Sequence, residues 1–143
     1  MSKFLFYGAA FLILRDDNKI LLSKRHNTGH EDGNFGLVSG HIEEKETAQR
    51  AIIREAFEEA GITLREEDLD VVHVQHRNAG DRTYFDVYLR ARAWSGDPIN
   101  KEPAKCSALE WVAMDSLPDN TVNYVADVLQ QIDAGVTYSN KGF

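Results

Sequence analysis

Residues 40–62 read GHIEEKETAQRAIIREAFEEAGI, and this stretch decides the fold of the chain. Apolar residues such as Ala51 and Ile52 recur at helical spacing within it, and Gly61 is a typical helix stop signal. The pattern therefore predicts a helix over about residues 47–60, with a loop ahead of it.

Three carboxylates crowd the predicted helix. Glu55, Glu58 and Glu59 are spaced i, i+3 and i+4, so Glu55 and Glu59 fall within roughly 40° of each other in projection, on the face that carries the small apolar residues. Like charges at this spacing destabilise a helix, and burying them unpaired is costly. A bound divalent cation such as Mg²⁺ or Mn²⁺ removes both problems, because carboxylate oxygens suit these ions. The alternative is an acidic helix face that is simply solvated.

Written as a pattern, the stretch is G-x5-E-x7-R-E-A-F-E-E-x-G-I. It resembles the Nudix box, G-x5-E-x7-R-E-U-x-E-E-x-G-U, in which U is an aliphatic residue. Seven fixed residues across 23 positions make this a specific match. The fixed positions are filled by Gly40, Glu46, Arg54, Glu55, Glu58, Glu59 and Gly61.

The resemblance implies a hydrolase that uses Mg²⁺ or Mn²⁺ to cleave a nucleoside diphosphate linked to another group. It also implies an α/β/α sandwich, in which a mixed β-sheet lies between helices. The same layering is expected from the order of strands and helices along the chain.

The resemblance divides the box residues by role. Glu55, Glu58 and Glu59 would bind the metal ion, with Glu55 and Glu58 also taking part in catalysis. Arg54 would support catalysis by orienting these carboxylates through charge-assisted hydrogen bonds. The remaining fixed residues would be structural, namely Gly40, Glu46 and Gly61.

The resemblance extends more loosely beyond the box, over about residues 4–134. Val38-Ser39-Gly40 stands where the family most often has Pro-Gly-Gly, yet Ser39 would still offer its backbone carbonyl to the metal ion. Arg25 occupies the position of a phosphate-binding arginine of MutT-type members, and its planar guanidinium suits that task. The alternative for Arg25 is a surface side chain at a strand end.

Two further positions have open alternatives. Glu102 lies in a loop where MutT-type members have a glutamate that serves as metal ligand or base; Glu110 competes for that role, although it is expected to face solvent. Asn120 occupies the position of a base-reading asparagine in MutT-type members, and its amide can donate and accept at once. An asparagine ahead of a helix is also a common N-cap, with Asp119 as a second candidate cap.

Apolar and β-branched runs predict six strands, and an amphipathic pattern predicts a second helix. The first two strands are expected to form a hairpin across the turn at residues 16–18. The second helix is expected at residues 120–134, on the opposite face of the sheet from the first. The predicted strands are residues 3–14, 19–25, 35–38, 69–78, 83–94 and 109–114.

The chain has 143 residues, which suits one domain over residues 1–143. Its net charge of −7 and the lack of a basic run argue against binding a long nucleic acid. The apolar run at residues 4–14 is too short to span a membrane and is expected to be a buried strand. Cys106 is the only cysteine, which rules out an intrachain disulfide and fits a reducing cytoplasm.

Together these features favour a cytoplasmic Nudix-type pyrophosphohydrolase that acts on a small-molecule nucleotide, as a monomer or a homodimer. The favoured reaction converts a nucleoside triphosphate to a nucleoside monophosphate and pyrophosphate. ADP-ribose or a nucleotide sugar is the alternative substrate. The other class is a nucleotide-sensing domain without catalysis, which the complete set of box carboxylates argues against.

Overall fold

The computed structural model describes residues 3–143 as two α-helices, nine strands and two short 3₁₀ helices. The α-helices are α1 (Ala48–Ala60) and α2 (Asn123–Asp133), and the 3₁₀ helices are η1 (Glu66–Asp68) and η2 (Met114–Ser116). The strands are β1 (Tyr7–Ile13), β2 (Arg15–Asp16), β3 (Lys19–Arg25), β4 (Phe35–Gly36), β5 (Ser39–His41), β6 (Leu69–Asn78), β7 (Thr83–Ala91), β8 (Cys106–Ala113) and β9 (Tyr138–Lys141).

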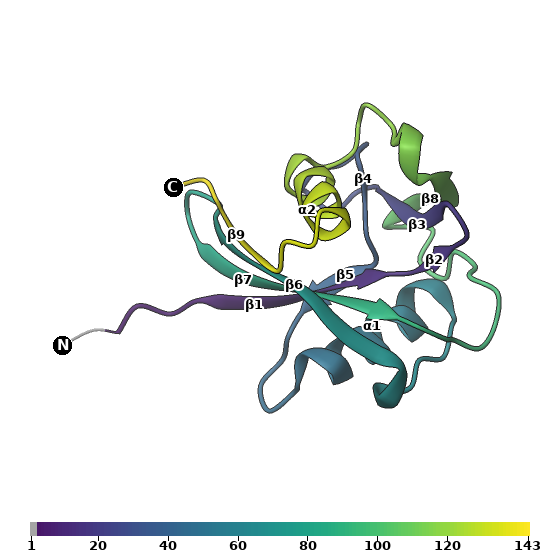
Figure 1. Cartoon of the computed structure of the whole chain (residues 1–143), viewed down its shortest axis with the longest axis horizontal. Coiled ribbons are helices and arrows are strands. Elements are labelled where there is room, and N and C mark those ends of the chain that lie inside the picture. The colour runs from purple at the N-terminus through teal and green to yellow at the C-terminus, as the bar shows by residue number, and fades with distance from the viewer. Residues whose placement is uncertain (1–2) are drawn as a thin grey trace.

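The strands form two sheets (Figure 1). A five-stranded sheet has the order β5-β1-β7-β6-β9, in which the β1–β7 and β6–β9 pairs are parallel and the other pairs are antiparallel. A second sheet has the order β2-β3-β4, with β8 antiparallel to β3. The predicted α/β class with a mixed sheet is therefore confirmed, although the strands divide between two sheets.

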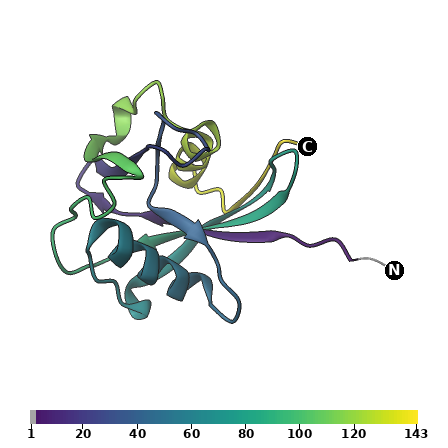
Figure 2. The same cartoon turned by 180° about the vertical axis from the view of Figure 1, so that it is seen from behind.

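The alternation of side chains along β1 explains why the two helices lie on opposite faces of the five-stranded sheet. Ala10 and Leu12 are buried in a cluster with apolar residues of α1. Phe11 and Ile13 are buried in a second cluster with apolar residues of α2. Figures 1 and 2 show the two helices on opposite sides of β1, so the predicted α/β/α layering is confirmed.

Helix α1 begins and ends where its sequence signals place it. The Thr47 side chain accepts a hydrogen bond from the backbone N–H of Arg50, which caps the N-terminus. Gly61 has a φ of 68°, a left-handed conformation that glycine adopts without a Cβ clash, and its N–H donates to the Phe57 carbonyl. The prediction of a helix over residues 47–60 is confirmed.

The predicted hairpin across residues 16–18 is confirmed only next to its turn, where β2 pairs with the start of β3, and β1 itself does not pair with β3. Both edges of β1 are occupied, by β5 on one side and by β7 on the other. Strand β3 instead pairs with β2, β4 and β8. The short β2 joins the two sheets, because it follows β1 directly and forms two residue pairs with β3.

The entry to α1 also differs from the sequence prediction. The strand expected at residues 35–38 is split into β4 and β5, so that Ser39 and Gly40 lie in a strand rather than a loop. They pair with β1, opposite Phe11 and Ala10, and this pairing fixes the backbone that leads into α1.

Three boundaries elsewhere depend on contacts that the local sequence does not signal. Strand β8 begins at Cys106, earlier than predicted, because it pairs with β3 over its whole length. Strand β9 is polar and short, and its parallel pairing with β6 holds it in place. Helix α2 begins at Asn123 rather than at residue 120. No helix within residues 3–143 is long and apolar enough to cross a membrane.

Candidate active site

Arg54 ties the loop before α1 to a carboxylate of the helix. Its Nε donates to Glu46 Oε2 at 2.9 Å and its Nη2 donates to Glu46 Oε1 at 3.0 Å, a two-point contact. Its Nη1 donates to Glu55 Oε1 at 2.7 Å. The hydrogen bonds from Arg54, and a further one from the backbone N–H of Glu43, lower the pKa of Glu46 to about 2. Glu46 therefore stays ionised at neutral pH and holds the loop against the helix.

Gly40 leaves the space that the Glu55 carboxylate occupies. A Cβ at residue 40 would lie 2.2 Å from Glu55 Oε1 and 2.3 Å from its carboxyl carbon. A side chain cannot fit at that distance without displacing the carboxylate. The backbone carbonyl of His41 accepts from Arg54 Nη2 at 3.2 Å, which holds β5 to the same arginine. The glycine of the motif thereby sets the position of Glu55.

Glu59 carries an unpaired buried oxygen. Its Oε2 atom is buried and has no hydrogen-bond partner among residues 3–143. Burial raises the pKa of Glu59 to about 10, and the neighbouring Glu55 carboxylate and the charge of Glu102 add to this effect. A carboxylate in such surroundings is costly to ionise unless a cation neutralises it. Glu59 is thus a strong candidate for a cation ligand.

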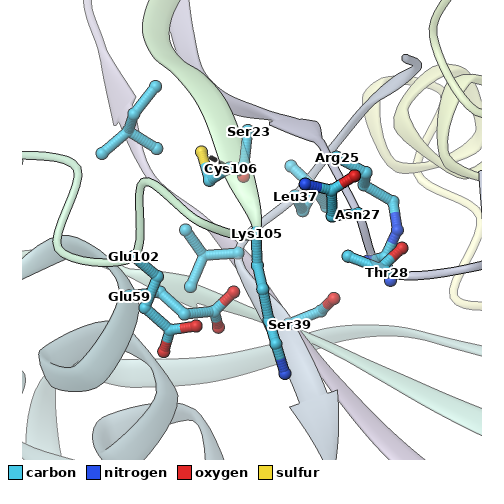
Figure 3. A pocket seen from close by; sticks show the side chains of 12 residues that line it. Ser23, Arg25, Asn27, Thr28, Leu37, Ser39, Glu59, Glu102, Lys105 and Cys106 are labelled. Atoms are coloured by element: carbon cyan, nitrogen blue, oxygen red, sulfur yellow. Dashed lines mark hydrogen bonds between the residues drawn. The ribbon is translucent and has the colours of Figure 1, made fainter. Parts of the chain in front are cut away.

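A cavity of about 330 Å³ lies beside α1, within the size range of small-molecule sites. Glu59 from α1 and Glu102 from the loop before β8 lie on one side of it, and Arg25 from the end of β3 lies on the other (Figure 3). The Lys105 side chain extends between the two groups, and Ser39 of β5 also lines the cavity. Acidic and basic walls therefore face each other across this space.

The structure brings together some of the predicted metal ligands and separates others. Glu59 and Glu102 line the cavity. Glu55 is held by Arg54, and the Glu58 side chain is 49% exposed with its Oε2 3.5 Å from Arg54 Nη1. In the part of the chain that the structure describes, no three acidic, histidine or cysteine side chains form a ready-made metal site. The oxygen donors nevertheless fit Mg²⁺ or Mn²⁺ in kind, and the orphaned Oε2 of Glu59 marks where such an ion would be stabilised.

Glu102, rather than Glu110, lines the cavity. Glu110 lies on β8 and is exposed. The Glu102 N–H donates to the Asn100 side chain at 3.1 Å, and the Glu102 carbonyl accepts from the N–H groups of Lys105 and Cys106, each at 2.9 Å. These hydrogen bonds form a tight turn that fixes the backbone of Glu102 at the cavity. Its assignment as ligand or base stays a prediction.

Arg25 and Lys105 supply the positive charge of the cavity walls. The Nε of Arg25 donates to the His30 carbonyl at 2.7 Å, which steadies the guanidinium at the end of β3. The His26 N–H donates to the Lys105 carbonyl at 3.0 Å, which fixes the backbone of Lys105 at the start of β8. Sequence reasoning misses Lys105, and its only sequence signal is its closeness to Glu102.

The N-cap reading of Asn120 is wrong, and so is that of Asp119. Helix α2 begins at Asn123, with Val122 at the cap position and no side-chain capping bond. The Asn120 Nδ2 donates instead to the Gly33 carbonyl at 2.8 Å, which ties the entry of α2 to the loop after β3. Asn120 does not line the cavity described above. The base-reading assignment of Asn120 stays a prediction.

Two further spaces adjoin this cavity. One has a volume of about 160 Å³ and the other a volume of about 450 Å³. Both are lined by Arg25, His41, Arg77 and Tyr84. Because Arg25 lines all three spaces, they lie next to one another around this side chain. Sequence reasoning does not single out Arg77, although a charged residue inside an otherwise half-buried strand is a usable signal.

A family model and a solved structure both match this chain to NUDIX proteins. The family model described as NUDIX domain matches residues 6–132. Among solved structures, the MutT NUDIX hydrolase from Burkholderia pseudomallei is similar, with a TM-score of 0.81 and 30% identity over 89% of this chain and 98% of that chain.

Two curated relatives carry activity names. A Mycobacterium tuberculosis protein provisionally named 8-oxo-dGTP diphosphatase 3 is 32% identical over 120 residues, which are 79% of this chain and 55% of that protein. The Escherichia coli protein named 8-oxo-dGTP diphosphatase is 27% identical over 112 residues, 77% of this chain and 85% of that protein. The chain thus spans only about half the length of the first of these relatives.

Proposed function

The chain belongs to the NUDIX domain family, and from that premise we propose that it hydrolyses a nucleoside triphosphate to a nucleoside monophosphate and pyrophosphate. The observation that carries the proposal is the cavity in which Glu59 and Glu102 face Arg25 and Lys105. Guanidinium and ammonium groups suit phosphate oxygens, while carboxylates suit a divalent cation and the proton of an attacking water. One cavity therefore offers groups for both parts of a phosphate anhydride hydrolysis.

The proposal includes Mg²⁺ or Mn²⁺ as the cofactor. The unpaired Oε2 of Glu59 and the crowding of carboxylates around it support this choice. When bound, the cation polarises phosphoryl oxygens and lowers the pKa of bound water. The residues that would hold it are the side chains of Glu55, Glu58, Glu59 and Glu102 and the backbone carbonyl of Ser39.

The other groups of the site bind, orient and accept a proton in this proposal. Arg25 and Lys105 donate charge-assisted hydrogen bonds to phosphate oxygens, which holds the anhydride against the acidic wall. Arg54 keeps Glu55 in one orientation through its 2.7 Å contact. Glu102 accepts the proton of the attacking water as the new bond to phosphorus forms, and pyrophosphate leaves with the electron pair of the broken P–O bond.

The names of the relatives support a nucleoside triphosphate as the substrate. The Escherichia coli and Mycobacterium tuberculosis proteins are both named for 8-oxo-dGTP, so this oxidised nucleotide is the first to test. ADP-ribose or a nucleotide sugar is the alternative, because such molecules present the same diphosphate linkage. A sensing domain that binds a nucleotide without cleaving it is the alternative from another class.

Hydrolysis of a nucleotide panel in the presence of Mg²⁺ or Mn²⁺ tests the proposal. The panel contains 8-oxo-dGTP, the four common deoxynucleoside triphosphates, ADP-ribose and UDP-glucose, with products separated by ion-exchange chromatography. Monophosphate and pyrophosphate released from a triphosphate would support the proposal. Cleavage of ADP-ribose or UDP-glucose alone would show that the substrate assignment is wrong. Binding without turnover across the panel would identify a sensor.

A further inference from the structure

A buried ion pair outside the carboxylate cluster has no role in the chemistry proposed above. Arg77 on β6 is 6% exposed, and Asp86 on the neighbouring β7 is fully buried. The Nε of Arg77 donates to Asp86 Oδ2 at 2.6 Å, and its Nη2 donates to Asp86 Oδ1 at 3.2 Å. Desolvating two charges is costly, so such a pair does not by itself explain stability. Recognition of a ligand would explain why a buried ion pair is present at this position.

Two aromatic rings pack against the guanidinium of Arg77. The centre of the guanidinium lies 4.2 Å from the ring centroid of Tyr84 on β7 and 4.0 Å from that of Tyr124 on α2. Both distances are within the range of cation–π contacts. The two hydrogen bonds to Asp86 and the two cation–π contacts together hold the guanidinium in one orientation. A side chain held in this way can offer a hydrogen-bond donor to a ligand in a fixed direction.

Arg77 lies within reach of a substrate in the catalytic cavity. It lines the space of about 450 Å³ and the space of about 160 Å³, together with His41 and Tyr84. Ser39 and Arg25 line both the smaller of these spaces and the catalytic cavity. A nucleotide with its phosphates between Glu59 and Arg25 can therefore extend toward Arg77 without crossing the protein core.

The charge balance at Arg77 favours a neutral acceptor over another phosphate. Asp86 neutralises Arg77, so the pair adds little net charge to the space that it lines. The hydrogen bonds that Arg77 makes within residues 3–143 use Nε and Nη2 and leave Nη1 for a ligand. An arginine has donors only and never accepts. The rings of Tyr84, Tyr124 and His41 around it suit a planar group.

We propose that Arg77, positioned by Asp86, Tyr84 and Tyr124, reads the nucleobase and selects bases with a keto oxygen over bases with an amino group at the same ring position. The inference rests on the proposed function, because it takes a nucleotide as the ligand. Hypoxanthine, guanine, uracil and thymine offer the keto acceptor, whereas adenine and cytosine present an amino donor that Arg77 cannot pair. Recognition of the base is thereby assigned to Arg77 rather than to Asn120, whose amide is bonded to Gly33.

Binding of matched nucleotide pairs tests this assignment apart from catalysis. Isothermal titration calorimetry in buffer with a chelator would compare IMP with AMP, and UMP with CMP, because each pair differs only in one keto or amino group and in the protonation of the ring nitrogen beside it. The wild-type protein should bind the keto member about 10- to 100-fold more tightly, the usual effect of a hydrogen bond to a charged group. The two members carry the same phosphate and sugar, so contacts to those groups cancel in the ratio.

The variant must remove both charges together, because Arg77→Ala alone would leave Asp86 buried and unpaired. The double variant Arg77→Gln, Asp86→Asn keeps a neutral hydrogen-bonding pair, and Gln can both donate and accept. Its IMP/AMP and UMP/CMP ratios should fall to near one at an unchanged melting temperature. Arg77→Lys retains the charge opposite Asp86 and loses the planar edge, so it tests the same point if the double variant is unstable. Arg92→Gln is the control and should leave both ratios unchanged, because Arg92 forms an exposed ion pair with Asp70 and lines none of the three spaces.

Three results would overturn the inference. The first is equal binding of the keto and amino nucleotides by the wild-type protein, and the second is a folded double variant that keeps the wild-type IMP/AMP and UMP/CMP ratios. The third is a double variant that binds IMP and AMP more weakly by the same factor, which would mean that Arg77 holds phosphate or sugar. Failure of the proposed function looks different. A protein that prefers IMP to AMP yet hydrolyses nothing in the nucleotide panel keeps the role of Arg77 and loses the activity. A protein that hydrolyses triphosphates but binds IMP and AMP alike keeps the activity and loses the role of Arg77.

Discussion

Gly40 and Glu55 share one space, because a Cβ at residue 40 would lie 2.2 Å from the Oε1 atom of Glu55. Glu55 cannot withdraw freely, since Arg54 Nη1 donates to the same oxygen at 2.7 Å. The fixed glycine and the fixed arginine of the motif therefore act on one carboxylate from two sides. This packing explains the fixed spacing of Gly40, Arg54 and Glu55 in the motif.

Gly40→Ala should displace the Glu55 carboxylate and lower both stability and activity. Overpacking of this kind typically costs about 1–3 kcal/mol, so the melting temperature should fall and kcat should fall with it. Gly36→Ala is the matched control, because a Cβ there would meet only a Val122 methyl at an ordinary 3.8 Å. Thermal melts and steady-state kinetics on both variants check the point. Wild-type values in Gly40→Ala would contradict the shared-space argument.

Glu46→Gln should lower stability at neutral pH and lose that effect in acid. The folded-state pKa of Glu46 is about 2, below its ordinary value of 4.5, so its ion pair contributes stability that is fully present above pH 4.5. The contribution is lost as the pH falls from 4.5 toward 2, where the folded-state carboxylate takes up its proton. Urea unfolding of both proteins from pH 7 to pH 2.5 should show the gap closing over that window. Glu44→Gln, an exposed neighbour, should show no gap at neutral pH, and a gap for Glu46→Gln that is constant with pH would contradict the assignment.

Local sequence signals predict α1 well and the pairing of β1 badly. The cap at Thr47 and the stop at Gly61 lie next to the helix that they delimit, so the bounds can be derived from the sequence. The parallel pairing of β1 with β7 joins Tyr7 to Tyr84. No turn residue or short-range pattern reports such a pairing. The hairpin expected from sequence closeness therefore forms only between β2 and the start of β3, and does not continue along β1. Strand β9 depends on β6 in the same way.

In the candidate site, too, local sequence predicts some residues, while others are brought in by contacts between distant parts of the chain. The helix carboxylates and Arg54 follow from the motif, whereas the choice of Glu102 over Glu110 for the cavity follows from the looser resemblance beyond the motif. Lys105 joins them only because the turn after Glu102 aims it there, which the sequence does not encode as a pattern. The Arg77–Asp86 pair depends on two strands lying side by side. For Asn120 the sequence leaves an N-cap role and a base-reading role open, and it does not signal the hydrogen bond that the Asn120 amide donates to Gly33, a residue far away in sequence.

Lys105→Gln should weaken catalysis if its ammonium group binds a phosphate oxygen. A hydrogen bond to a charged group contributes about 1.5–3 kcal/mol, so kcat/KM should fall about 10- to 100-fold. Lys101→Gln is the matched control, because Lys101 lies on the same loop and packs beside Gly61 rather than lining the cavity. Lys105→Arg should recover part of the loss. Equal kcat/KM values for the two glutamine variants would remove Lys105 from the site.

Glu102→Gln should lower kcat by about 10²- to 10⁴-fold if Glu102 accepts the proton of the attacking water. Glutamine keeps the shape of the side chain, so the melting temperature should stay near that of the wild-type protein. Glu110→Gln is the control, because Glu110 is exposed on β8 outside the cavity. A silent Glu102→Gln together with an inactive Glu110→Gln would reverse the assignment.

Glu59→Gln tests the metal site through stability as well as activity. In a chelating buffer the variant should melt no lower than the wild-type protein, because the raised pKa of Glu59 keeps its carboxyl protonated there and glutamine is a neutral group of the same shape. Mg²⁺ should raise the melting temperature of the wild-type protein, since a ligand present at 100 times its Kd stabilises the folded state by about 2.7 kcal/mol. The same addition should raise the melting temperature of Glu59→Gln much less, and kcat should fall.

The comparison of melts with and without Mg²⁺ separates a ligand from a residue that only shapes the site. A structural role for Glu59 would lower the melting temperature in both buffers and leave the Mg²⁺-dependent rise intact. A ligand role lowers the rise alone, because the cation loses one oxygen donor, whereas in the apo protein the raised pKa keeps Glu59 protonated and glutamine replaces one neutral group with another. Glu110→Gln serves again as the control and should show the full rise. An undiminished rise and wild-type turnover in Glu59→Gln would show that cation binding does not depend on Glu59. The proposed chemistry of this cavity would then be wrong.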